Sequence, residues 1–186
     1  MITVSLCMIV KNEEDVLERC LASAAPLADE IIIVDTGSTD ATKEIAAKYT
    51  AKVFDYPWQN DFAAYDCFIV GASTWFDGEL PTYWDELLPE LRTMKLKGKK
   101  VAIFGLGDQI RYPENFADGI GLLAEVFEGD EATLVGFTSS EGYTFEHSKA
   151  LRGEQWCGLV VDLDNQSEQA EKKIKAWCQQ VKKEFA

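Results

Sequence analysis

The stretch Tyr65-Asp-Cys-Phe-Ile-Val-Gly-Ala-Ser-Thr-Trp75 decides the fold of this chain. Its apolar first part predicts a buried strand over 65–71, and its small, hydroxyl-bearing end predicts a loop that presents Trp75. A second predicted strand, over 99–105, runs into Phe104-Gly-Leu-Gly-Asp-Gln-Ile-Arg-Tyr112. If the two strands are parallel neighbours, Trp75 and Tyr112 flank a slot at the carboxyl edge of the sheet, where open α/β sheets bind ligands. A flat aromatic ligand fits between two such rings.

Apolar runs alternate with amphipathic segments along all 186 residues. This alternation predicts a doubly wound α/β fold, in which helices cover both faces of a parallel sheet. The remaining strands are predicted near 2–10, 30–35 and 51–56, with a last strand in two pieces near 132–137 and 156–161. Helices are predicted near 12–24, 40–49, 80–93, 114–128 and 167–184. Short polar residues at Thr39-Asp40 and from Asn165 to Ser167 are typical of helix starts.

The composition limits the partners that we expect. The formal net charge is −14, from 32 acidic and 18 basic residues. Such a surface argues against nucleic-acid binding, which depends on neutralising phosphates, and it suits either solubility alone or docking to basic proteins. No apolar run approaches the ~20 residues of a membrane span. The first apolar run has no basic segment before it, so we expect a strand there and no signal peptide.

The cysteines and the single histidine indicate no metal site. The five cysteines show neither a Cys-x-x-Cys pair nor metal-ligand spacing: they are Cys7, Cys20, Cys67, Cys157 and Cys178. Cys7 and Cys67 fall inside apolar predicted strands, where a free thiol packs as a small apolar group. Free thiols suit a reducing compartment, so we expect a cytoplasmic protein. His147 lies in a polar stretch and is expected at the surface.

From about residue 65 to its end the chain resembles the long-chain flavodoxins, which are FMN-binding electron carriers. The matching segments are Ala72-Ser-Thr-Trp-Phe-Asp-Gly-Glu-Leu80, Gly98-Lys-Lys-Val-Ala-Ile-Phe-Gly-Leu-Gly-Asp-Gln109, Tyr112-Pro-Glu-Asn-Phe116, Glu141-Gly-Tyr-Thr-Phe145 and Gly158-Leu-Val-Val-Asp-Leu-Asp-Asn-Gln-Ser167. The resemblance implies a flavodoxin-like sheet. It also explains residues 138–155, which we expect to be the surface loop that distinguishes long-chain from short-chain flavodoxins.

The same resemblance implies an FMN site made by two loops. In it, Trp75 and Tyr112 would flank the isoalloxazine ring. The remaining contacts would come from the backbone of Gly107, Asp108 and Gln109 at the pyrimidine edge and from Ser73 and Thr74 near the ribityl chain or phosphate. Phe76 and Arg111 depart from the family, because many relatives carry small residues at these positions. Arg111 would either stabilise a reduced, anionic flavin or block the slot, and the two aromatic rings would be unused surface residues if no flavin binds.

The first third of the chain has a different resemblance. Residues 1–63 resemble the start of a family 2 glycosyltransferase, through Val4-Ser-Leu-Cys-Met-Ile-Val-Lys-Asn-Glu-Glu14, Asp29-Glu-Ile-Ile-Ile-Val-Asp-Thr-Gly-Ser-Thr-Asp-Ala-Thr42 and Ala51-Lys-Val-Phe-Asp-Tyr-Pro-Trp-Gln-Asn-Asp-Phe62. Two families joined near residue 64 predict a recombined or engineered chimera. We expect residues 1–64 and 65–186 to share a single domain.

Two loops of the first third compete for the flavin phosphate. Lys11-Asn-Glu-Glu-Asp15 would place three carboxylates against a dianion, so FMN is expected to bind weakly or not at all. The alternative is Thr36-Gly-Ser-Thr-Asp-Ala-Thr42, with Thr36, Ser38 and Thr39 as candidate phosphate contacts. The glycosyltransferase resemblance instead implies that this segment binds a nucleoside and that Asp35 contacts the base or ribose. A plain helix-capping turn is the third alternative.

We expect the strands of each segment, glycosyltransferase-like and flavodoxin-like, to keep the neighbours that they have in their own family. This gives six parallel strands in the order 3-2-1-4-5-6. The rival order equates strand 30–35 with the first flavodoxin strand and moves strand 2–10 to an edge, for which it is too apolar. The fourth strand ends Gly71-Ala-Ser-Thr74 where a glycosyltransferase has its Asp-x-Asp metal site, so we expect no glycosyl transfer. We expect a monomeric flavodoxin-like carrier with basic redox partners when FMN binds. A ligand-free fold and a nucleotide-binding module that uses Asn12 and Asp35 are the alternatives.

Overall fold

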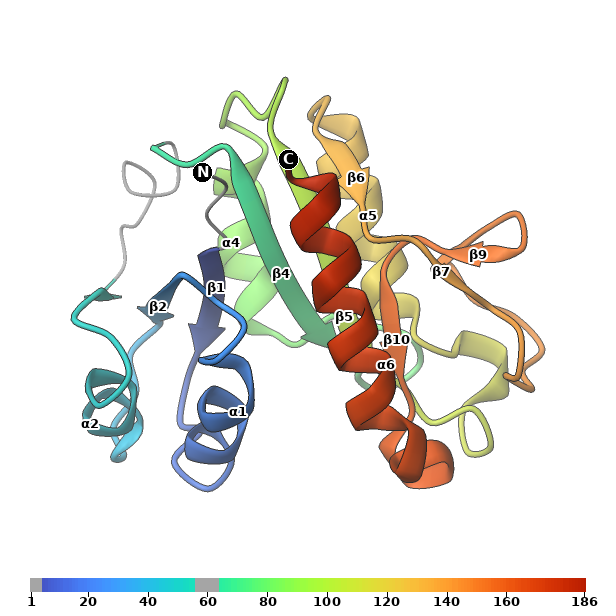
Figure 1. Ribbon diagram of the computed structural model, residues 1–186, viewed down its shortest axis with the longest axis horizontal. Coiled ribbons are helices and arrows are strands. Elements are labelled where there is room, and N and C mark those ends of the chain that lie inside the picture. The colour runs from blue at the N-terminus through green and yellow to red at the C-terminus, as the bar shows by residue number, and fades with distance from the viewer. Residues whose placement is uncertain (1–4, 56–63) are drawn as a thin grey trace. The chain divides into compact units, whose positions relative to one another are not determined.

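The computed structural model describes residues 5–55 and 64–186. The chain forms two compact units, residues 1–69 and 70–186, which Figure 1 draws from blue to cyan and from green to red. Strand β4 (Cys67–Ser73) contains the boundary between them. The single domain expected from the sequence stays a prediction, as does a join near residue 64.

The first unit is a parallel sheet with two helices. Its elements are β1 (Ser5–Val10), α1 (Leu17–Ala24), β2 (Glu30–Asp35), α2 (Thr42–Ala47), β3 (Val53–Asp55) and the first residues of β4. Strand β1 pairs in parallel with β2 along its whole length and with β4 where Leu6 meets Ile69. The sequence prediction that strand 2–10 lies inside the sheet is therefore confirmed for its described residues. Residues 2–4 and 56, the ends of two predicted strands, lie outside the described residues.

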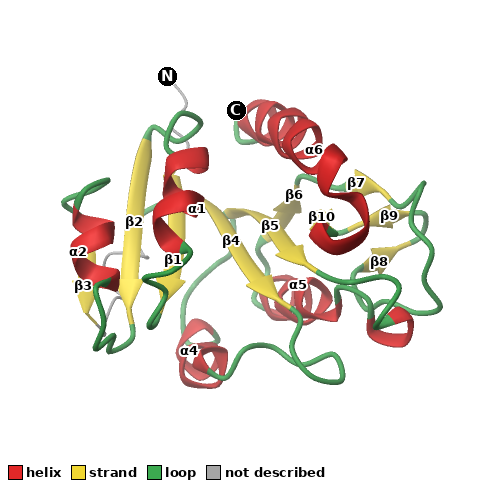
Figure 2. Cartoon of the chain, turned by 90° about the horizontal axis from the view of Figure 1, so that it is seen from below, coloured by secondary structure: helices red, strands yellow, loops and turns green. Residues whose placement is uncertain are grey.

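The second unit carries helices on both faces of its strands. Its elements are the rest of β4, α4 (Tyr83–Leu91), β5 (Lys100–Leu106), the short 3-10 helix η1 (Pro113–Asn115), α5 (Asp118–Gly129), β6 (Thr133–Val135), β7 (Thr138–Ser139), β8 (Leu151–Arg152), β9 (Gln155–Trp156), β10 (Leu159–Val161) and α6 (Leu163–Glu184). In Figure 2, α6 lies on one face of β4 and β5, and α4 and α5 lie on the other. This confirms the predicted layering.

The hydrogen-bonded neighbours follow the order β10-β5-β4-β1-β2-β3, which confirms the predicted order 3-2-1-4-5-6. The last strand is also in two pieces, as predicted. Strand β6 pairs with the start of β5, where Val101 meets Leu134, and β10 pairs with its end, where Leu159 meets Phe104. Two short strands thus share the length of β5, because residues 138–155 interrupt them.

Two local predictions were wrong. Residues 138–155 are not only a loop: β7, β9 and β8 form a small antiparallel sheet. Helix α6 begins at Leu163 rather than near residue 167, because the carboxylate of Asp162 accepts a hydrogen bond from the amide of Asn165 at 3.0 Å and caps the helix earlier. Helix α6 has a non-helical residue at Gln166. Its regular part therefore starts close to the predicted position.

The second unit's core explains why β4 contains a glycine. A Cβ atom on Gly71 would lie 2.4 Å from the ring of Phe104, so the ring occupies the space of a side chain. Phe104 in turn meets Trp177 of α6 edge to face, with ring centroids 6.2 Å apart. On the opposite face, Trp84 and Leu87 of α4 are buried. Packing on both faces thus fixes the strands whose ends carry the candidate site.

Candidate functional site

A cavity of about 260 Å³ lies at the carboxyl ends of β4 and β5. Of the residues predicted from the sequence, it is lined by Thr74 and Trp75 from the loop after β4 and by Gly107, Asp108 and Tyr112 from the loop after β5. The two aromatic side chains remain 41 % and 45 % exposed, which is high for residues of their size. Their faces are therefore available to a ligand.

A tight turn presents Trp75. Its N–H donates to the carbonyl of Glu79 at 2.8 Å, and its own carbonyl accepts from the N–H groups of Gly78 and Glu79. The next residue, Phe76, is 71 % exposed and has a φ of 43°, a left-handed conformation that is costly for a bulky residue. Backbone strain of this kind is typical of functional loops. The rings of Trp75 and Phe76 meet edge to face with centroids 6.1 Å apart.

Asp108 shapes the loop that presents Tyr112. Its Oδ1 accepts from the N–H groups of Ile110 and Arg111 at 3.0 and 2.9 Å. The hydrogen bond from Arg111 holds the pKa of Asp108 below its ordinary value. The side chain of Asn165 on α6 donates to the same oxygen at 2.9 Å. Asp108 is therefore an anchored carboxylate in the wall of the cavity.

Two predicted residues of the second unit, Ser73 and Gln109, lie outside the cavity lining. Gln109 is buried and bonds to Asp162 and to the amide of Thr144, so its side chain fixes the loop from behind. The N–H groups of Gly107 and Gln109 donate to Val161 and Asp162, so both are engaged inside the protein. Ser73 ends β4 and is half-buried. The proposed flavin contacts of all these groups stay predictions.

The structure adds residues that the sequence reasoning did not single out. Asn115, Phe116 and Ala117 complete the cavity opposite the β4 loop. The Oδ1 atom of Asn115 is buried and has no hydrogen-bond partner within the described part of the chain. A ligand with a hydrogen-bond donor would satisfy it. The quoted match Tyr112-Pro-Glu-Asn-Phe116 contained two of these residues, so the signal was present.

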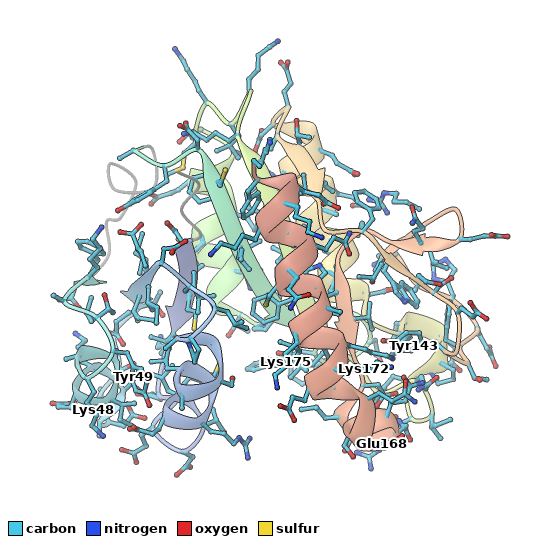
Figure 3. The ribbon with its side chains drawn as sticks, viewed as in Figure 1. Lys48, Tyr49, Tyr143, Glu168, Lys172 and Lys175 are labelled. Carbon is cyan, nitrogen blue, oxygen red and sulfur yellow. The ribbon has the colours of Figure 1, made fainter. Side chains whose placement is uncertain are left out.

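Behind the cavity, Phe116 belongs to a cluster of four aromatic rings with Tyr143, Phe145 and Trp156. Figure 3 labels Tyr143, whose hydroxyl donates to the carbonyl of Val160 at 2.6 Å. Lys173 of α6 lies over its ring, 4.1 Å from the centroid. Burial raises the pKa of Tyr143 to about 12. Phe116, which lines the cavity, is therefore packed against three further aromatic rings.

In the first unit, the loops after β1 and β2 bond to one another. The N–H groups of Asn12 and Glu13 donate to the hydroxyl groups of Ser38 and Thr42 at 2.8 and 2.7 Å. The N–H of Thr39 donates to the side-chain oxygen of Asn12 at 2.8 Å. Thr36, Ser38 and Thr39 are thus brought together in one loop of the first unit. Their phosphate role stays a prediction.

Asp35 at the end of β2 is buried, and its Oδ1 accepts from the N–H groups of Gly37 and Ser38 at 2.9 and 2.8 Å. Burial raises the pKa of this carboxyl, but the hydrogen bonds from Ser38 and Gly37 and the charge of Lys43 outweigh it, so the net pKa is lowered. Its second oxygen is buried and has no partner among the described residues. Asp35 is therefore an anion with one unused acceptor.

Comparison with known proteins gives two matches along the chain. The Flavodoxin family model matches residues 39–177, which is most of the chain, and the Glycosyl transferase family 2 model matches residues 5–65. The chain belongs to the flavodoxin family. It is 36 % identical over 163 residues to a flavodoxin of Klebsiella pneumoniae, covering 80 % of this chain and 93 % of that protein. It is 43 % identical over 126 residues to a flavodoxin of Synechococcus elongatus, covering 68 % and 74 %.

Solved flavodoxins share its fold. The flavodoxin of Fusobacterium nucleatum bound to flavin mononucleotide aligns over 100 % of both chains, with a TM-score of 0.77 and 24 % identity. The flavodoxin match begins at Thr39, earlier than residue 65, where the sequence reasoning placed it. The two family matches therefore overlap over residues 39–65. No helix in the described part of this flavodoxin is long and apolar enough to cross a membrane.

Proposed function

We propose that this flavodoxin is an electron carrier that holds the isoalloxazine ring of FMN between Trp75 and Tyr112. The half-exposed rings of these residues, on two loops that line one cavity, carry the proposal. The unpartnered Oδ1 of Asn115 supports it, because the flavin ring system has an N–H group to donate. FMN would supply the redox chemistry, and the protein's own residues would bind it, orient it and exclude water.

We further propose that the phosphate of FMN is held weakly. In the loop after β1, three successive N–H groups are already bonded, from Asn12, Glu13 and Glu14 to side chains of the loop after β2. Amides that are engaged in this way cannot also receive a phosphate. Glu13 and Glu14 add negative charge to the same loop, which opposes a dianion.

Titration with two flavins tests both parts of the proposal. FMN and riboflavin, which lacks the phosphate, are each titrated with the purified protein while flavin fluorescence is followed. We expect saturable quenching by both, with dissociation constants within about threefold of each other. Absence of quenching by either flavin contradicts the ring site. Binding of FMN that is about 30-fold or more tighter than that of riboflavin contradicts the weak phosphate contacts.

As a carrier, the protein would dock to redox partner proteins rather than catalyse a reaction of its own. Its net charge of −14 supports basic partners, because opposite charge steers association. We propose a cytoplasmic, monomeric carrier without glycosyltransferase activity. We also propose that it is a chimera of two parents, which the overlapping matches to two families support.

A second candidate function is nucleotide binding by the first unit. The buried, unpartnered oxygen of Asp35 favours it, since a nucleoside base or ribose carries the donors that this oxygen lacks. Thermal unfolding with and without uridine diphosphate tests it. An increase in melting temperature that the Asp35→Asn variant loses would support nucleotide binding, and no increase at millimolar nucleotide would contradict it.

A further inference from the structure

A second and larger cavity of the second unit lies between α4 and α5. It is a groove of about 920 Å³. Its lining residues recur at helical spacing: Asp85 and Leu88 lie on α4 and Arg92 follows its end, and Leu122, Val126 and Gly129 lie on α5. Residues three or four apart share one face of a helix. One face of each helix therefore borders the groove.

The rim of this groove, hereafter the α4–α5 groove, is acidic. Among its lining residues are five acidic ones, Asp77, Glu79, Asp85, Glu125 and Asp130, and two basic ones, Arg92 and Lys149. The difference, five minus two, is an excess of three negative charges. Lys149 lies 3.6 Å from Asp118, so part of its charge is compensated outside the lining. One carboxylate oxygen of Asp130 is buried and has no partner in the described part of the chain.

The apolar part of the lining, hereafter the floor, includes Leu80, Leu88 and Leu122, which are all half-buried. The described residues contain no group of three His, Cys, Asp or Glu side chains that could hold a metal ion, so a bound cation does not explain the carboxylates. A small polyamine would satisfy the rim but leave the floor uncovered. An apolar floor under an acidic rim instead complements a helix with one apolar and one basic face.

We propose that the α4–α5 groove is the docking site of a basic amphipathic helix from a partner protein. The wall of α4 from Thr82 to Arg92 spans about 15 Å at 1.5 Å per residue, which corresponds to about three turns of the docked helix. Leucine-like side chains of the partner cover the floor, and its lysine or arginine side chains face Asp85 and Glu125 across the groove. The site is separate from the flavin cavity, and binding requires no flavin.

The groove and the flavin cavity share one turn. Asp77, Gly78 and Glu79 border the groove, and the same turn holds Trp75 through the hydrogen bonds of Gly78 and Glu79. A Cβ atom on Gly78 would lie 2.8 Å from the carboxylate of Asp118 at the start of α5, so the turn is closely packed there. A docked helix therefore contacts the segment that presents Trp75, and its binding changes the environment of that indole.

The test uses the full chain and a blocked 14-residue peptide of leucine and lysine with helical amphipathic spacing. A scrambled peptide of the same composition is the control for simple attraction to the net charge. Nuclear magnetic resonance of the ¹⁵N-labelled protein follows the titration. We expect saturable shifts confined to residues 77–92 and 118–130, to Lys149 and to the indole of Trp75. Equal binding of the scrambled peptide or of spermine, or shifts centred elsewhere, overturns the proposal.

Charge variants make the test independent of folding defects. Reversal of the exposed pair with Asp85→Lys and Glu125→Lys is expected to weaken peptide binding about tenfold, because two attractions become repulsions. The matched control combines Glu141→Lys and Glu154→Lys, which are exposed positions beside β7 and β9. It changes the net charge by the same amount, and we expect the dissociation constant of the peptide to stay within about twofold of the wild-type value. Arg92→Glu is expected to strengthen binding about threefold, a gain that misfolding cannot produce. Loss of binding in the control pair, or no gain with Arg92→Glu, contradicts the site.

Discussion

Gln109 and Asp162 are joined by two hydrogen bonds inside the second unit. The backbone N–H and the side-chain Nε2 of Gln109 both donate to one carboxylate oxygen of Asp162, at 3.1 and 2.7 Å. Both residues are buried, with 4 % and 2 % of their surface exposed. The loop that carries Asp108 and Tyr112 is therefore fastened to the start of α6 through this carboxylate.

Replacement of that carboxylate is expected to be costly. Asp162→Ala leaves the two buried donors of Gln109 unpartnered and removes the cap of α6, so we expect the free energy of unfolding to fall by about 2–4 kcal/mol. Urea denaturation followed by circular dichroism measures the change. Asp164→Ala, an exposed neighbour on the same helix, is the matched control and is expected to change stability by less than about 0.5 kcal/mol. Equal effects of the two variants would contradict the role of Asp162.

Stability is also expected to fall at alkaline pH. Burial raises the pKa of the Cys157 thiol from 9.0 to about 11. The unfolded chain therefore loses this proton first, and between pH 9 and pH 11 each rise in pH favours the unfolded state. The loss from this group is about 2 kcal/mol across that range. Comparison of unfolding free energies of the wild type and Cys157→Ala at pH 8, 9, 10 and 11 measures it, and parallel pH profiles would contradict it.

The flavin proposal gives a paired prediction. Trp75→Ala and Tyr112→Ala each remove one face of the slot, and we expect each to weaken riboflavin binding by about tenfold, since ring stacking and buried area are lost together. Riboflavin is the probe because the result then depends on the ring and not on the phosphate. Tyr49→Ala, a half-buried tyrosine of the first unit that bonds to Glu18, is the control and should leave affinity unchanged. If either slot variant retains full affinity, the ring is not held between these residues.

Much of the sheet could be predicted from the sequence, for a physical reason. Ile31, Ile32, Ile33 and Val34 are apolar in succession, and strands buried on both faces need such runs. Strand β1 is equally apolar, which argued against placing it at the edge of the sheet and so favoured the strand order 3-2-1-4-5-6. The strands β7, β8 and β9 are only two residues long, so they have no periodicity to detect. The start of α6 was misplaced because its cap, Asp162, is identified by a contact and not by a pattern.

The candidate site was predictable in part. Trp75 and Tyr112 were found because the ends of neighbouring parallel strands meet at one edge of a sheet. Asn115 stood in a quoted matching segment but was not singled out, and Ala117 was missed. Their place in the cavity depends on a 3-10 helix and on the left-handed φ of 58° at Ala117, and neither has a sequence pattern. Gln109 was expected to contact the ligand through its backbone, which stays a prediction, and the structure adds that its side chain bonds to Asp162. This hydrogen bond could not be predicted from a local pattern, because Asp162 lies 53 residues away from Gln109 in the chain.

The sequence left open whether Arg111 stabilises a reduced flavin or blocks the slot, and its position in the structure favours the first. Its side chain is 73 % exposed, and its Nε lies 3.9 Å from Asp108 Oδ2, which lines the cavity. This position suits a cation that stabilises negative charge on reduced FMN without closing the slot. We expect Arg111→Gly to lower the one-electron midpoint potential of bound FMN by about 20–40 mV. For one electron this corresponds to about 0.5–1 kcal/mol, as expected for an exposed charge.

Spectroelectrochemical titration at low ionic strength measures the potential, and Arg111→Lys, which keeps the charge, should restore most of it. The difference between wild type and Arg111→Gly should shrink in about 1 M salt, where exposed charges are screened. If Arg111 blocked the slot instead, Arg111→Gly would bind riboflavin severalfold more tightly and leave the potential unchanged. Because the potential changes in the first case and the riboflavin affinity changes in the second, one variant decides between them.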